Sequence, residues 1–133
     1  MKVSYLIDTD WVIHYLNGHK GIMEKLESLK EEGLAISVIS LAELYEGVYY
    51  STKPDADEAA LNDFLTDISI FGIENEICKL FGKERGKLRK AKKMVGDFDL
   101  LIASTCLYYD LTLLTNNKKH YKMVDALKLL SEE

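Results

Sequence analysis

One stretch of the sequence decides the fold: VGDFDLLIAS, residues 95–104. It places Asp97 and Asp99 two positions apart, directly before an uncharged apolar segment that continues through Tyr109. This pattern predicts a buried helix that begins at the two acids. We expect Asp97 to be its N-cap, because Asp is a favoured cap and gains from the helix dipole. A second carboxylate at a buried helix start is unfavourable without a partner, so Asp99 needs another explanation, such as a bound cation.

The composition is that of a soluble globular protein. Of the 133 residues, 47% are hydrophobic and 29% are charged, which predicts one domain over residues 1–133. No apolar run is long enough to span a bilayer, and the start of the chain lacks the pattern of a secretory signal. Cys78 and Cys106 lack metal-ligand spacing and are expected to be buried thiols. These features predict a cytoplasmic protein with no membrane contact.

A basic segment stands out against the net charge of −5. Between Lys83 and Lys93 there are seven basic residues and one acid. Such a segment is either a solvated helix face or a surface that holds a phosphate backbone. The candidate contacts to nucleic acid are Arg85, Lys87, Arg89, Lys90, Lys92 and Lys93.

Apolar strands and amphipathic helices alternate along the chain. Strands are expected at residues 3–7, 34–39, 70–73 and 111–114. Helices are expected at residues 11–16, 22–30, 40–50, 58–68, 76–93 and 97–109. The tail at residues 126–130 fits either an edge strand or a short helix. This alternation predicts an α/β fold around a mainly parallel sheet.

Four polar residues are predicted to meet at one edge of that sheet. Asp8 follows the first strand, Glu43 lies within a turn of the second, and Asn117 follows the fourth. With Asp99 they would face the crevice at the carboxyl ends of the strands. Each also has a simpler interpretation. Asp8 can cap a helix, Asn117 can be a turn residue, and Ser40 with Glu43 can form a capping box.

The chemistry of such a cluster points to a divalent cation. Clustered carboxylates repel one another, and one stays protonated unless a cation lies between them. A ligand set of oxygen atoms alone selects Mg²⁺ or Mn²⁺. An ion of this kind polarises a phosphoryl oxygen and activates a bound water. Together with the basic segment, the acids predict hydrolysis of phosphodiester bonds in nucleic acid.

Four segments resemble the PIN domain. They are LIDTD at 6–10, ISVISLAEL at 36–44, DLLIA at 99–103 and LLTNN at 113–117. Their order and spacing, and the chain length, resemble those of VapC-type ribonuclease toxins. The resemblance implies an α/β/α sandwich and an endoribonuclease that cleaves RNA by Mg²⁺- or Mn²⁺-activated water. It also implies a homodimer that a VapB-type antitoxin silences.

The resemblance assigns roles to individual residues. Asp8, Glu43 and Asp99 match the three metal-coordinating positions of the family. Asn117 matches a fourth position, with Thr115 as its supporting hydroxyl. An amide at position 117 carries no charge, so a second ion is expected to bind weakly.

Two further residues are assigned roles. Ser40 is expected to support Glu43 from the start of its helix. Asp97 matches an acidic position that only some members have, so it is either the helix cap or a weaker metal contact.

Two alternatives compete with a nuclease. The segment DTDWV at 8–12 fits a haloacid-dehalogenase-like phosphatase with Asp8 as nucleophile. That alternative needs an apolar strand before Gly96-Asp97, where the chain has KAKKMV instead, and it leaves Glu43 unexplained. The other is a PIN-like scaffold that has lost its metal, and the presence of all three carboxylates argues against it.

Overall fold

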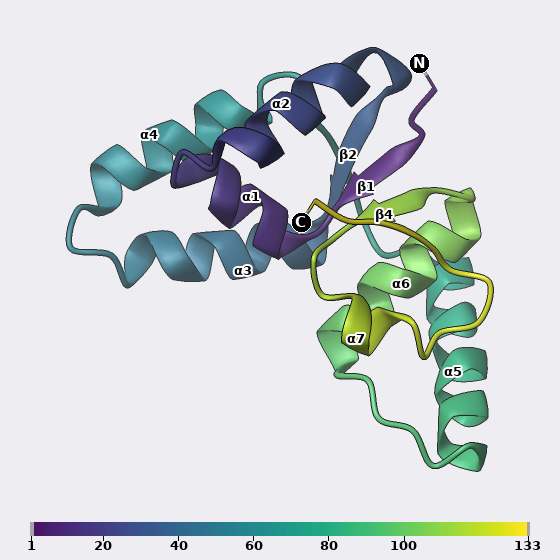
Figure 1. The fold of residues 1–133 in the computed structure, drawn as a ribbon. Coiled ribbons are helices and arrows are strands. Elements are labelled where there is room, and N and C mark those ends of the chain that lie inside the picture. Colours follow the sequence, from purple (N-terminus) through teal and green to yellow (C-terminus); the bar gives the residue numbers. More distant parts are fainter. Residues whose placement is uncertain (1, 133) are drawn as a thin grey trace.

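The chain forms a parallel five-stranded sheet between two layers of helices (Figure 1). The computed structural model describes residues 2–132. The strands are β1 (Tyr5–Ile7), β2 (Leu34–Ser37), β3 (Ser69–Phe71), β4 (Thr112–Leu114) and β5 (Lys128–Leu130). Their order is β3-β2-β1-β4-β5, and every neighbouring pair is parallel. The predicted α/β/α fold is confirmed, and the tail is an edge strand rather than a helix.

The helices divide between the two faces of the sheet. They are α1 (Thr9–Leu16), α2 (Lys20–Leu29), α3 (Val38–Tyr49), α4 (Pro54–Leu65), α5 (Asn75–Lys90), α6 (Asp97–Tyr109) and α7 (Lys118–Tyr121), with a 3₁₀ turn at Lys30–Glu32. Helices α1 to α4 lie on one side of the sheet, and α5 and α6 pack together on the other (Figure 1). Within residues 2–132, no helix is both long and apolar enough to cross a bilayer.

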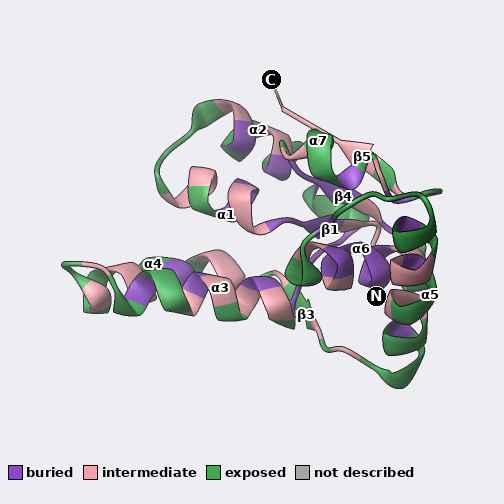
Figure 2. Ribbon diagram, turned by 90° about the horizontal axis from the view of Figure 1, so that it is seen from below, coloured by how far each residue is buried: buried purple, intermediate pink, exposed green. Residues whose placement is uncertain are grey.

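Side-chain alternation along the strands divides the core between the two faces. Leu6 of β1 and Leu113 of β4 pack with α5 and α6. The next residues, Ile7 and Leu114, pack with α1 to α4. All four side chains are fully buried, so these short strands are apolar on both faces, as strands of covered parallel sheets are. Figure 2 shows the buried sheet with exposed residues on the outer helices.

Two helix N-caps differ from the sequence-based expectation. Helix α3 begins at Val38, because the Ser37 side chain accepts a hydrogen bond from the Ile39 amide at 3.0 Å. Ser40 therefore lies inside the helix, and the simpler interpretation of Ser40 and Glu43 as a capping box is wrong. Helix α6 has Gly96 as its N-cap with no side-chain cap bond. The prediction that Asp97 caps this helix is therefore also wrong.

Helix α5 ends at Lys90, three residues before the predicted end. Lys92 adopts the left-handed conformation with φ = 57°. Its amide donates to Arg89 O at 3.1 Å, and the Lys93 amide donates to Leu88 O at 2.9 Å. These are the two hydrogen bonds of a Schellman C-cap. The end of the basic segment is therefore a turn that leads toward α6.

The two cysteines differ in burial. Cys106 is a residue of α6 whose side chain lies in the core, as expected. Cys78 is exposed on α5, so the expectation of a second buried thiol is wrong.

Candidate active site

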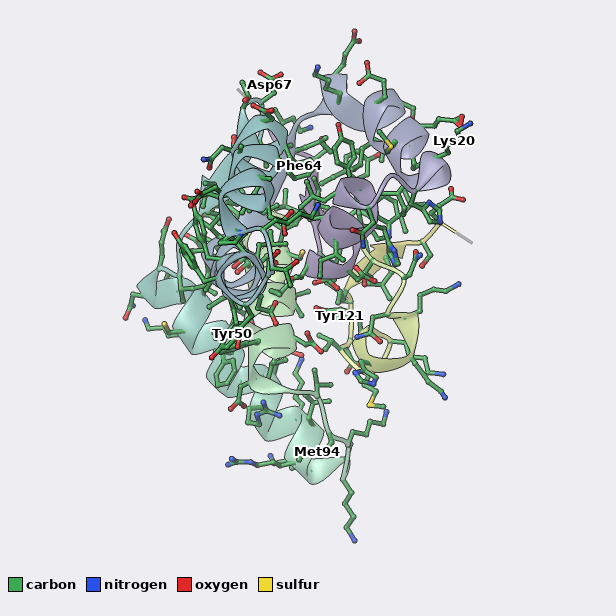
Figure 3. The ribbon with its side chains drawn as sticks, turned by 90° about the vertical axis from the view of Figure 1, so that its left-hand side faces the viewer. Lys20, Tyr50, Phe64, Asp67, Met94 and Tyr121 are labelled. Atoms are coloured by element: carbon green, nitrogen blue, oxygen red, sulfur yellow. The ribbon has the colours of Figure 1, made fainter. Side chains whose placement is uncertain are left out.

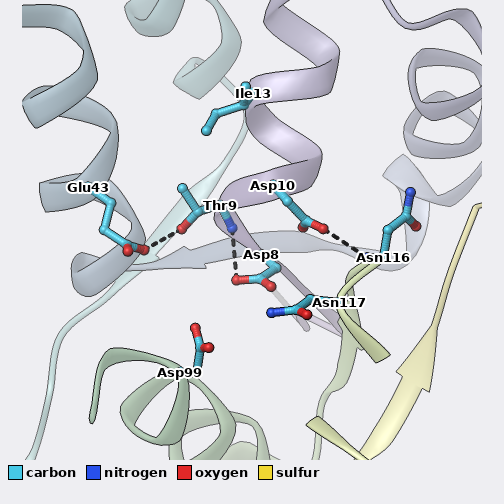
Figure 4. A pocket seen from close by; sticks show the side chains of 8 residues that line it. All are labelled: Asp8, Thr9, Asp10, Ile13, Glu43, Asp99, Asn116 and Asn117. Carbon is cyan, nitrogen blue, oxygen red and sulfur yellow. Dashed lines mark hydrogen bonds between the residues drawn. The ribbon is translucent and has the colours of Figure 1, made fainter. Parts of the chain in front are cut away.

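Polar side chains from four parts of the chain line one pocket at the carboxyl edge of the sheet (Figure 4). We call this the acid pocket. Its lining residues are Asp8, Thr9, Asp10, Ile13, Glu43, Asp99, Asn116 and Asn117. Figure 4 shows Asp8 near the centre, with Glu43 from α3 and Asp99 from α6 on separate sides. The four residues predicted to meet in space, Asp8, Glu43, Asp99 and Asn117, therefore all line this pocket.

Asp8 is held by hydrogen bonds at the end of β1. Its Oδ1 accepts from the Thr9 amide at 2.9 Å, which makes Asp8 the N-cap of α1. Its Oδ2 accepts from the Thr115 hydroxyl at 2.7 Å. The same Thr115 oxygen accepts from the Asn117 amide at 3.0 Å. Thr115 thus joins Asp8 to the loop that carries Asn117, while Asp8 serves both as a helix cap and as part of the pocket.

The electrostatics of Asp8 favour its neutral form in the metal-free protein. The residue is 5% exposed, and its pKa is raised to about 7, chiefly by burial. The neighbouring charges of Asp10 and Asp99 also raise the pKa, whereas hydrogen bonds from Thr115 and Thr9 lower it and partly offset these effects. A cation in the pocket would reverse this preference, because it stabilises the ionised carboxylate.

Asp10 is a second buried carboxylate beside Asp8. Burial raises the pKa of Asp10. Its Oδ2 accepts a hydrogen bond from the Asn116 amide at 3.0 Å. Its Oδ1 is buried and has no hydrogen-bond partner within residues 2–132. The pocket thus contains more carboxylate charge than its own donors satisfy.

Glu43 is positioned through Thr9. The Thr9 hydroxyl donates to Glu43 Oε1 at 2.7 Å. Thr9 Oγ1 also lies at hydrogen-bond distance, 3.0 Å, from the hydroxyl of buried Ser40. Ser40 therefore acts on Glu43 through Thr9. The role of Thr9 was not predicted from the sequence, since nothing in its residue type or spacing indicates a contact to a residue 34 positions away.

Asp99 faces the pocket from the first turn of α6. Its Oδ1 lies 3.2 Å from the Tyr121 hydroxyl, and its Oδ2 lies 3.9 Å from His120 Nδ1. Both neighbours belong to the short helix α7, which was not predicted from the sequence. A helix of four residues has too little periodicity to be recognised, so the contacts of His120 and Tyr121 could not be anticipated.

Asp97 lies outside the acid pocket. Its side chain is 80% exposed and pairs with Arg85 Nη2 at 2.7 Å. Arg85 also donates through Nη1 to Val95 O at 2.8 Å, and its own side chain is 14% exposed. This position does not support the interpretation of Asp97 as a metal contact. It also shows that Arg85 fastens the α5–α6 turn rather than presenting a free cation.

The remaining basic residues gather at the end of α5. We call Lys87, Arg89, Lys90, Lys92 and Lys93 the basic end of α5. All five are exposed, and Lys87 pairs with Glu84 at 3.0 Å. Figure 3 shows neighbouring Met94 at one extremity of the molecule, whereas Tyr121 lies near its middle. The basic end is thus a peripheral surface, apart from the acid pocket.

The acid pocket has the donor chemistry of a hard divalent cation. Carboxylate and amide oxygens surround it, and Asp10 Oδ1 lacks a partner in the part of the chain that the structure describes. Oxygen ligands of this kind suit Mg²⁺ or Mn²⁺. In the present arrangement of residues 2–132, no three acid, His or Cys side chains are close enough to share one ion. Asp8 and Asp99 already lie on either side of the Tyr121 hydroxyl, so a third acid would have to approach this pair for three acids to share one ion.

Comparison with known families agrees with this geometry. The PIN domain family matches residues 5–126. The chain belongs to the PIN domain family. It is 35% identical to Ribonuclease VapC2 of Rickettsia felis over 127 residues, which cover 94% of this chain and 95% of the relative. It is 29% identical to Ribonuclease VapC2 of Haemophilus influenzae over 128 residues, which cover 95% and 96%.

A solved structure has the same fold. The crystal structure of VapBC2 from Rickettsia felis bound to a promoter DNA fragment superposes with a TM-score of 0.93 and 32% identity, covering 98% of this chain and 100% of that one. Membership of the PIN family overturns the phosphatase alternative. That alternative also needed an apolar strand directly before Gly96-Asp97, where the structure has the end of α5 and a turn.

Proposed function

We propose that this protein is a VapC-type endoribonuclease that uses Mg²⁺ or Mn²⁺ and acts as the toxin of a toxin–antitoxin pair. The observation that carries the proposal is the meeting of Asp8, Glu43, Asp99 and Asn117 in one pocket. These side chains come from different elements, and helix capping alone would not bring them together. The family places the chain among PIN ribonucleases, since the relatives from Rickettsia felis and Haemophilus influenzae are both named ribonucleases.

The pocket residues divide into ligands and supports. Asp8, Glu43 and Asp99 would hold the ion, with Asn117 as a weaker neutral ligand. A bound Mg²⁺ or Mn²⁺ would neutralise phosphate charge and lower the pKa of a coordinated water. Thr115 orients Asp8, and Thr9 orients Glu43. Such supporting hydrogen bonds fix the direction of each carboxylate before the ion arrives.

The RNA backbone would be bound by the basic end of α5. Its cations are exposed and lie at the end of α5 and in the turn that leads to Asp99. Lysine and arginine that contact phosphates contribute affinity without reading sequence. Arg85 is assigned a different role, because it is already bonded to Asp97 and Val95. It would keep the basic end in a fixed relation to α6.

The partners of this chain follow from the same family. The crystallised relative from Rickettsia felis is a VapBC2 complex on promoter DNA, and we propose a VapB-like antitoxin for this chain. A homodimer remains a prediction, as do a cytoplasmic location and the action of residues 1–133 as one unit. An inactive scaffold is disfavoured, because all three carboxylates face the pocket with supporting donors in place.

A matched pair of substitutions tests the proposed function. Asp99→Asn removes one negative charge inside the pocket, whereas Asp97→Asn removes the same charge outside it. We expect Asp99→Asn to lower RNA cleavage about a thousandfold, equivalent to about 4 kcal/mol of transition-state stabilisation. Asp97→Asn should stay within about threefold of wild type, because an exposed ion pair contributes little.

The assay uses purified protein and a labelled RNA in Mn²⁺, followed by gel electrophoresis. Cleavage should stop in EDTA and return when excess Mn²⁺ is added. Equal cleavage by wild type and Asp99→Asn would contradict the proposal. It would mean that the activity comes from a contaminating nuclease or from another site. Cleavage that persists in EDTA would exclude the metal-dependent mechanism.

A further inference from the structure

The hydroxyl of Tyr121 lies between two carboxylates of the acid pocket. Tyr121 ends the short helix α7, and its side chain is fully buried in the core cluster beneath α6. Figure 3 places it near the middle of the molecule. A buried phenol needs a hydrogen-bond partner for its hydroxyl, and here the partners are acids rather than the backbone.

The two contacts of this hydroxyl are of equal length. Its oxygen lies 3.2 Å from Asp8 Oδ1 and 3.2 Å from Asp99 Oδ1. The two carboxylate oxygens are therefore no farther apart than twice that distance. Asp8 comes from the end of β1 and Asp99 from α6, so one hydroxyl connects two elements of the pocket. Because a phenol carries one proton, the two acids share a single donor.

The two acids depend on Tyr121 to different extents. Asp8 accepts two further hydrogen bonds, from the Thr9 amide and the Thr115 hydroxyl. Within residues 2–132, the hydrogen bond to the Asp99 carboxylate comes from Tyr121. His120 lies farther away, at 3.9 Å. Loss of the Tyr121 hydroxyl would therefore leave Asp8 in place and free Asp99.

We propose that Tyr121 is a positioning residue whose hydroxyl holds Asp99 beside Asp8 before the ion binds. This inference rests on the proposed metal-dependent function. A phenylalanine at position 121 would fill the same space in the core but would not connect the acids. The role therefore belongs to the hydroxyl and not to the ring.

Two matched substitutions test this role. Tyr121→Phe removes the hydroxyl at the pocket. Tyr109→Phe removes one that donates to Glu74 at 2.6 Å, outside the pocket. Removing a support of a metal ligand typically weakens metal binding 10- to 100-fold. We expect the Kd for Mn²⁺, from calorimetric titration, to rise about tenfold in Tyr121→Phe and to stay unchanged in Tyr109→Phe. A rise below about threefold, or tighter binding, would overturn the proposal.

A second measurement uses the unsubstituted protein. With tyrosine labelled by ¹³C at Cζ, addition of Mg²⁺ should shift the signal of Tyr121 and leave that of Tyr109 in place. The substituted proteins assign the two signals. No shift at Tyr121 upon saturation would mean that its hydroxyl does not sense the ion, and the proposed role would be wrong.

Failure of the proposed function would be visible separately. If wild type binds no Mn²⁺, the metal-dependent function fails, and melting in EDTA then decides whether the hydroxyl links the acids. We expect Tyr121→Phe to lower the melting temperature more than Tyr109→Phe, because it leaves the half-buried Asp99 carboxylate without its donor. Equal melting temperatures would overturn the link itself.

Discussion

The acid pocket and the basic end of α5 carry opposite charge and are built in opposite ways. The pocket is assembled from distant parts of the chain: Asp8 bonds to Thr115 and Tyr121, which follow it by 107 and 113 positions. The basic end is a continuous segment from Lys87 to Lys93, and the ion pair of Lys87 with Glu84 joins residues three positions apart. One region depends on the whole fold and the other on one helix end.

This difference determines how each region responds to change. Asp8 is buried in the pocket beside other carboxylates, so its charge interacts strongly with its surroundings, and its pKa is raised to about 7. Charges at the basic end are exposed, where water and salt screen them. A single substitution should therefore have a large effect in the pocket, whereas effects at the basic end should be small and nearly additive.

The largest effect is expected in the pH dependence of stability. The folded-state pKa of Asp8 is about 7, above the ordinary value of an unfolded aspartate. The folded protein thus binds more protons than the unfolded chain between these two values, and its stability falls as pH rises through that window. For Asp8 alone the loss between pH 4 and pH 8 is roughly 4 kcal/mol. Urea unfolding in EDTA at several pH values measures it.

Asp8→Asn serves as the control, because an amide does not titrate. The stability of this variant should lack the Asp8 contribution and vary less with pH. Saturating Mn²⁺ should reverse the trend in wild type, since the ion binds the ionised carboxylate. Identical pH profiles for wild type and Asp8→Asn in EDTA would show that the pocket does not raise the pKa of Asp8. The proposed difference in electrostatics between the acid pocket and the basic end would then be wrong.

A smaller effect is expected at the basic end. Replacing Lys90 and Lys93 together by alanine removes two candidate phosphate contacts. We expect kcat/KM for RNA cleavage to fall about tenfold at low salt, with a weaker dependence on salt. The matched control replaces Lys20 and Lys25 of α2, which lies on the other face of the sheet. An equal loss in both double variants would mean that only net charge matters, and the basic end would not be the RNA surface.

Much of the fold and part of the site could be predicted from the sequence. Apolar runs located β1, β2 and β4 because covered parallel strands are apolar on both faces. The positions of Asp8, Glu43 and Asn117 after strand ends were enough to bring them to one edge. Contacts such as Thr9 to Glu43 could not be predicted, because they depend on how closely two helices pack. The start of α3 was missed because Ser37 and Ser40 are equally good caps, and local preference does not choose between them.

Asp97 and Asp99 show a further limit of prediction from the sequence, and helical geometry explains it. Residues two positions apart on a helix point to different sides. If one of the two acids faces the pocket, the other must therefore face away from it. The resemblance to the PIN domain assigned Asp99 to the pocket, but local sequence preference alone does not choose between the two acids, because the choice depends on where α6 meets the sheet. The Arg85 contact to Asp97 settles the orientation, and Arg85 lies on another helix.

The smallest effect is expected where the basic end turns toward α6. Lys92 occupies the left-handed position of the Schellman cap at φ = 57°, where glycine is the favoured residue. Relief of this strain outweighs the greater freedom of glycine in the unfolded chain, so Lys92→Gly should stabilise the protein by about 0.5–1 kcal/mol. The same change at Lys90, the last residue of α5, should destabilise it, because glycine disfavours a helix. Urea unfolding of both variants, which lose the same charge, separates backbone strain from electrostatics. If both lose stability, the turn is not strained. If both gain, charge repulsion within the basic end is strong, contrary to the screening that distinguishes it from the acid pocket.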